Sequence, residues 1–221
     1  MKTLTIISSL AIISSFTQAN EIASIDSASN QMNIEQLTQL SQQTDGYDKG
    51  YALYRLAINA NILGQKNKAL SALQEAESRL ASAQDDGEVA TLLAAIYGMQ
   101  IGLDLTKASS YGPKMSAAIN TADNLVPDSP RLALVKAISA YSTPVEYGGS
   151  MKRAIELSSK AISLFETPCD SICWGYAEAY TWRGLAKQNL GDKQGAISDW
   201  QAALAVQDDY AWANFLLKQH N

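Results

Sequence analysis

The sequence predicts an all-α protein built as a stack of about four antiparallel helical hairpins, followed by a C-terminal capping helix. Apolar residues recur every three to four positions through most of the chain, which is the period of an amphipathic helix. Turn-forming Gly, Asp and Pro residues separate these stretches, so neighbouring helices are expected to run antiparallel. The third observation is repetition, because alanine pairs seven residues apart recur at Ala69/Ala76, Ala154/Ala161 and Ala196/Ala203.

The first residues are typical of a secretory signal peptide. Lys2 precedes a mostly apolar run over residues 4–16, and Thr17-Gln18-Ala19 offers small residues for cleavage. A membrane-spanning helix needs roughly 20 apolar residues, and this run is shorter and interrupted by serines. We therefore expect removal of residues 1–19, no membrane span in the remaining chain, and a periplasmic or secreted protein.

Residues 20–33 are polar and rich in Ser and Asn, which predicts a flexible lead-in before a helical domain over residues 34–221. The chain of 221 residues has a net charge of −5 and no basic tract. Negative charge of this kind disfavours nucleic acid and anionic membranes as partners.

The first two hairpins follow a short helix that begins near residue 34. Residues 51–63 form the first long helix, with Asp48 as its expected N-cap, and Asn67 is expected to cap its partner. The second hairpin begins after Asp85-Asp86-Gly87, and Pro113 suits the first turn of its second helix.

The third hairpin begins at Ser129-Pro130, an N-cap followed by proline at the first helical position. Thr143-Pro144 stops that helix, because proline disfavours helix in the residue before it. A tight loop follows, and Ser150 is the expected N-cap of the next helix.

The fourth hairpin, over residues 177–206, has the clearest pattern. Tyr180 and Gly184 share one packing stripe, Gly191-Asp192 forms the turn, and the second helix places Trp200 between Ala196 and Ala203. This order of aromatic, small residue, turn glycine, Ala, aromatic and Ala resembles the tetratricopeptide repeat (TPR) superfamily. The resemblance implies a right-handed solenoid that acts by binding. The loop over residues 144–150 is similar to one in exported bacterial TPR proteins associated with tripartite carboxylate transporters.

The TPR resemblance also implies where a partner binds, since TPR ligands lie along the concave face made by the first helix of each hairpin. Transferred residue by residue, that face holds Tyr51, Tyr54, Ile58, Asn61, Glu178, Thr181, Leu185, Gln188, Trp212 and Phe215. These side chains are mainly apolar or neutral, which suits an extended or helical peptide. The Lys/Asn set that clamps a terminal carboxylate in chaperone-binding TPRs is absent from these positions.

The sequence offers little for catalysis. The only histidine is His220, next to the C-terminus, whereas nucleophilic triads and dyads need a held imidazole. No cysteine and histidine set has zinc spacing, and no loop has the glycine and lysine pattern that cradles phosphate. We therefore expect a protein that is not an enzyme and carries neither cofactor nor metal.

Cys169 and Cys173 have two interpretations. In an exported protein they meet oxidising conditions, which favours a disulfide at the turn between two hairpins. A Cys-x-x-x-Cys spacing also occurs in thiol-redox and copper sites, although no His or Met lies nearby to complete a copper site. Trp174 and Trp182 fall beside filled packing positions, so both surface and core placement remain open for them.

These observations lead to an exported TPR-like scaffold that binds a protein or peptide on its concave face. The first alternative is a transporter-associated adaptor for a small ligand, which would need an enclosed pocket. The second is a thiol-redox or copper-binding protein that uses Cys169 and Cys173.

Overall fold

The structure, a computed structural model, describes residues 21–169 and 171–220 as helices joined by short connections. No strand occurs in this part of the chain. Residues 21–30 are helical and are called the N-terminal helix below. The later helices are α2 (Ile34–Gln43), α3 (Gly46–Ile62), α4 (Lys66–Leu80), α5 (Gly87–Leu103), α6 (Ala108–Leu125), α7 (Pro130–Ser142), α8 (Met151–Phe165), α9 (Tyr176–Asn189), α10 (Lys193–Val206) and α11 (Ala211–Lys218). Three short 3₁₀ turns, at Ala81–Ala83, Leu105–Lys107 and Val145–Tyr147, lie in the connections.

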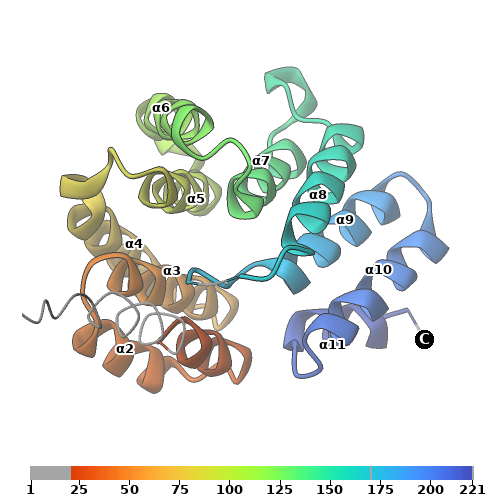
Figure 1. Ribbon diagram of the computed structural model, residues 1–221, viewed down its shortest axis with the longest axis horizontal. Coiled ribbons are helices and arrows are strands. Elements are labelled where there is room, and N and C mark those ends of the chain that lie inside the picture. The colour runs from red at the N-terminus through yellow and green to blue at the C-terminus, as the bar shows by residue number, and fades with distance from the viewer. Residues whose placement is uncertain (1–20, 170, 221) are drawn as a thin grey trace, which may run out of the picture.

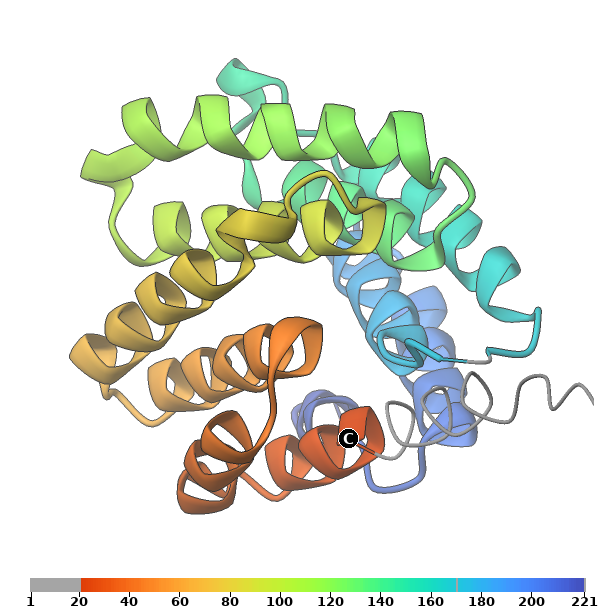
Figure 2. The same ribbon diagram turned by 60° about the vertical axis from the view of Figure 1, so that its left-hand side comes forward.

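The helices pack as four consecutive hairpins, which confirms the predicted all-α solenoid. α3 packs on α4, α5 on α6, α7 on α8 and α9 on α10, while α11 covers α10 as the expected C-terminal cap. The first helices of the hairpins also contact one another in sequence and form an inner layer. The solenoid curves so strongly that its red N-terminal and blue C-terminal ends face each other (Figure 1, Figure 2).

The repeated alanines lie where helices approach closely. All six members of the Ala69/Ala76, Ala154/Ala161 and Ala196/Ala203 pairs are buried. Trp200 is fully buried beside Gly184, where an added Cβ would lie 2.5 Å from the indole Nε1 atom. Only a glycine lets α9 approach the Trp200 ring this closely, so the fourth hairpin packs as its sequence predicts.

The predicted helix starts are partly confirmed. Ser129 and Ser150 both cap their helices by accepting a hydrogen bond from a backbone N–H group. Asp48 is instead buried inside α3, which begins two residues earlier after Asp45. Asn67 lies within α4, whose N-cap is Gln65. Pro113 lies in the interior of α6 and not in its first turn, because the helix begins at Ala108.

The expectation of a flexible lead-in over residues 20–33 is wrong for the part that the structure describes. Residues 21–30 form a helix in which Ile22, Ile25 and Ala28 are fully buried. Their spacing of three residues places them on one face, and the intervening Ser and Asp residues concealed this pattern. Asn33 then caps α2 through its side chain. The predicted signal peptide over residues 1–19 lies outside the described residues.

Candidate functional site

The ten residues expected on an open concave face are distributed between core and surface. Tyr51, Tyr54, Glu178 and Thr181 are buried, so they cannot contact a partner in this conformation. Ile58, Leu185, Gln188 and Trp212 are half-buried, and Asn61 and Phe215 are exposed. The inner layer is therefore covered where these four buried residues lie. A partner can reach α3 and α9 only at later positions such as Ile58 and Leu185.

Two segments provide this cover. One is the N-terminal helix, which packs against α3 and hydrogen-bonds through Ser29 to Asn59. The other is the connection between α8 and α9, residues 166–175, which we call the strap. Its Trp174 is 4% exposed and stacks on Tyr51 with ring centroids 5.1 Å apart. The indole N–H of Trp174 donates to the Tyr47 hydroxyl at 2.8 Å. Trp174 therefore belongs to the core, which decides between its two possible placements.

A buried ionic cluster joins the two ends of the solenoid. The Arg55 guanidinium on α3 lies 3.0 Å from Asp26 on the N-terminal helix and 3.3 Å from Glu178 on α9. The Tyr51 hydroxyl donates to Asp26 at 2.5 Å. Burial raises the pKa of both carboxyl groups, and the nearby Arg55 charge opposes that rise only in part. Because each ion has a partner, the cluster explains why Glu178 is buried and does not face a ligand.

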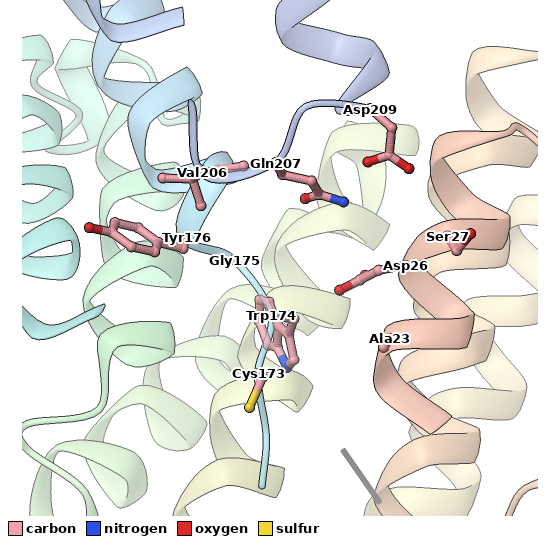
Figure 3. Close-up of a pocket in the computed structure, with 11 residues that line it drawn as sticks. Ala23, Asp26, Ser27, Cys173, Trp174, Gly175, Tyr176, Val206, Gln207 and Asp209 are labelled. Carbon is pink, nitrogen blue, oxygen red and sulfur yellow. The ribbon is translucent and has the colours of Figure 1, made fainter. Parts of the chain in front are cut away.

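A pocket of about 370 Å³ lies directly beside this cluster. It opens between the N-terminal helix, the end of the strap and the connection from α10 to α11 (Figure 3). Asp26 and Asp209 place two carboxylates in its lining, and Trp174 and Tyr176 add aromatic rings. Gln207 contributes an amide, and none of the lining residues that the structure describes is basic. Carboxylates next to aromatic rings form a site for an amine or guanidinium group.

The acidic character of this pocket could not be read from the sequence. Asp26 belongs to the segment expected to be flexible, and Asp209 to a turn between helices. The structure brings them together because the solenoid closes, with Asn30 donating to Asp209 at 3.3 Å across the junction. The spacing of residues within one helix cannot predict a contact between residues at opposite ends of the chain.

The two cysteines form a disulfide, as the first of their interpretations predicts. Cys169 and Cys173 are bonded with a Cα–Cα distance of 5.6 Å, and both are exposed on the strap. A bonded pair offers no thiolate for copper.

Among the described residues, no group of three or more His, Cys, Asp or Glu side chains is arranged to hold a metal ion. In the same part of the chain, no helix has both the length and the apolar character needed to cross a membrane.

Comparison with known proteins shows a likeness of fold alone. The sequence matches no protein-family model and no curated protein. Among solved structures it is similar to the HusA haemophore from Porphyromonas gingivalis, with 22% identity, a TM-score of 0.61, and coverage of 83% of this chain and 96% of that one.

Two further structures share the architecture. The thermophilic TPR protein TTC0263 of Thermus thermophilus has 16% identity and a TM-score of 0.55, over 92% of this chain and 93% of that one. The Cut9–Hcn1 hetero-tetramer of the APC/C has 18% identity and a TM-score of 0.50, over 89% of this chain and 33% of that one. The four hairpins, their alanine contacts and these likenesses together identify the fold of the chain as a TPR-like helical-repeat solenoid.

Proposed function

We propose that the protein is an exported scaffold that binds a protein or peptide partner, and that a basic group of this partner enters the pocket beside Asp26 and Asp209. The observation that carries the proposal is the composition of the pocket lining, which combines two carboxylates with aromatic rings and, among the residues described, includes no basic side chain. Asp26 already has Arg55 and Tyr51 as partners, so Asp209 is the carboxylate more available to a ligand. A lysine or arginine side chain is complementary in charge to this pocket.

Export is supported by the exposed disulfide of the strap. A disulfide in an exposed connection persists in an oxidising compartment, whereas cytosolic reductants would open it.

A site-specific photo-crosslinker tests the partner-binding proposal in cells that export the protein. Val206 lies on the rim of the pocket and is 40% exposed, so it can carry the crosslinking side chain without disturbing the core. Lys152, on the exposed surface of α8, is the matched control position. We expect a discrete protein adduct from position 206, none from position 152, and loss of the adduct when Asp209→Lys is added. Equal adducts from both positions, or an adduct that Asp209→Lys leaves unchanged, would contradict the proposal.

A small ligand is the second candidate, because a pocket of about 370 Å³ falls within the range of small-molecule sites, roughly 300–1,000 Å³. The likeness to a haemophore makes haem one ligand to test. The two carboxylates oppose it, since the haem propionates are anionic at neutral pH. Native mass spectrometry of the purified protein decides between the candidates. A bound small molecule would favour the adaptor alternative, and a haem absorbance band after haemin addition would favour haem capture.

A further inference from the structure

The strap is a long connection that enters the interior of the solenoid. Residues 166–175 leave α8, reach toward α3 and return to the start of α9 (Figure 1). The described part of this segment contains no helix or strand. Its Trp174 lies against α3 on the inner layer, the face on which a repeat scaffold of this kind presents its binding surface.

Two residues of the strap, Ile172 and Trp174, attach it to that face. The Trp174 ring stacks on Tyr51, and its N–H group donates to the Tyr47 hydroxyl, both on α3. The Ile172 carbonyl accepts a hydrogen bond from the Arg131 guanidinium on α7. Glu88 on α5 holds Arg131 through two hydrogen bonds of 2.7 and 2.8 Å. An aromatic slot and a fixed guanidinium that binds a peptide carbonyl are together a recognition site for an extended segment.

The remainder of the strap is weakly attached. Residues 166–169 are exposed, and so is Cys173. Among the described residues of the stretch 168–174, none makes a backbone–backbone hydrogen bond to the rest of the chain. Segments with few hydrogen bonds and few buried contacts open locally before the fold as a whole does. Apart from the anchors at Ile172 and Trp174, few backbone hydrogen bonds therefore oppose local opening of the strap.

We infer that the surface formed by Tyr47, Tyr51 and Arg131 is a binding site for an extended peptide segment that carries an aromatic residue, and that the strap occupies this site until a partner segment replaces it. The inference rests on the proposed function only in taking the partner to be a polypeptide. Because the strap is tethered at both ends, its local concentration at the site is on the order of millimolar. A free peptide that makes the same contacts should therefore bind this site measurably only when Trp174 of the strap no longer occupies it.

The test uses the full chain with Trp174→Ala, which empties the slot. The probe is a fluorescent peptide, Ser-Ile-Ser-Trp-Gly-Tyr, copied from residues 171–176 with Ser in place of Cys173, and the readout is fluorescence anisotropy. We expect the variant to bind this peptide and wild type to bind it at least about tenfold more weakly, because wild type keeps its own competitor. A peptide with Ala in place of Trp should lose about thirtyfold in affinity, the effect of removing an aromatic anchor. Trp182→Ala, which removes a tryptophan outside the site, should not gain binding.

Failure to bind by a Trp174→Ala protein that retains wild-type helicity would overturn the inference. If this variant does not fold, the paired change Cys169→Ser and Cys173→Ser replaces it, since both side chains are exposed and Trp174 is retained. That protein has a looser strap and should bind the Trp peptide more tightly than wild type does; equal affinities would overturn the inference. A crosslinked partner at position 206 together with no peptide binding would leave the proposed function standing and remove only the inference about the strap.

Discussion

Replacing Arg55 by methionine should destabilise the protein more than any other single change of charge. Arg55 has a side chain that is 8% exposed, and its partners Asp26 and Glu178 are 16% and 9% exposed. Methionine fills a similar volume but leaves two carboxylates close together without a counter-ion. Removal of one partner from a buried ionic cluster costs about 3–5 kcal/mol. For a domain of this size each kcal/mol shifts the melting temperature by about 2–4 °C, so we expect a decrease of about 6–20 °C.

The loss should depend on pH in a defined direction. The pKa values of Asp26 and Glu178 are already raised by burial in the presence of Arg55, and removing its positive charge raises them further. A raised folded-state pKa means that the folded protein binds protons more tightly than the unfolded chain. Stability therefore decreases as the pH rises from the ordinary carboxyl pKa through the folded-state pKa. The deficit of Arg55→Met should be large near pH 7.5 and smaller at about pH 5, where the folded carboxyl groups take up protons.

Urea denaturation followed by circular dichroism at both pH values measures this deficit. Arg153→Met is the matched control, because Arg153 pairs with Glu156 on the surface, where the two side chains are 58% and 64% exposed. An exposed pair of this kind contributes only about 0–1 kcal/mol. If Arg55→Met lost no more stability than Arg153→Met, or lost more at acidic pH than at neutral pH, the cluster would not hold the solenoid closed as described.

Four further predictions concern the core, the disulfide and the N-terminus. Trp200→Ala should lower the free energy of unfolding by about 3–5 kcal/mol, measured by urea midpoint, because it leaves a cavity in the fourth hairpin; an unchanged midpoint would mean that Trp200 is not core. Gly184→Ala should cost about 1–3 kcal/mol in the same assay through the contact of the new methyl group with the Trp200 ring, and a stabilised variant would show that α9 can move away. Without reductant, Cys169 and Cys173 should resist alkylation, and their replacement by serine should cost at most about 2 kcal/mol; rapid labelling of the untreated protein would contradict the bond. The intact mass of the exported protein should correspond to a chain that starts at Asn20, and a mass that includes residues 1–19 would refute cleavage there.

The hairpins could be predicted from the sequence because the information for them is local. Ala196, Trp200 and Ala203 lie within two turns of one helix, and their spacing alone specifies a packing stripe. The Gly191-Asp192 turn is equally local, and Asp192 caps α10 through its side chain. The TPR resemblance added the stacking of hairpins, which the structure confirms.

The site could not be predicted in the same way, because it depends on contacts between distant parts of the chain. The pairing of Arg55 with Glu178 spans 123 residues, and the hydrogen bond from Trp174 to Tyr47 spans 127. An open superhelix would have left Tyr51 and Glu178 facing solvent, as the resemblance implies. The closed form buries both of them, and helical periodicity contains no signal for that closure.

The closed form also changes how the molecule should respond to force. An open solenoid behaves as a spring, because each hairpin touches only its neighbours and the end repeats separate first. In this protein the two ends are joined into a closed ring by the hydrogen bond between Asn30 and Asp209 and by the ionic cluster around Arg55. A force applied between the chain ends acts on both sets of contacts at once. The hairpins should therefore separate from one another only after these contacts break. The contacts that join the ends should therefore limit how far the ring can stretch, a constraint that an open array lacks.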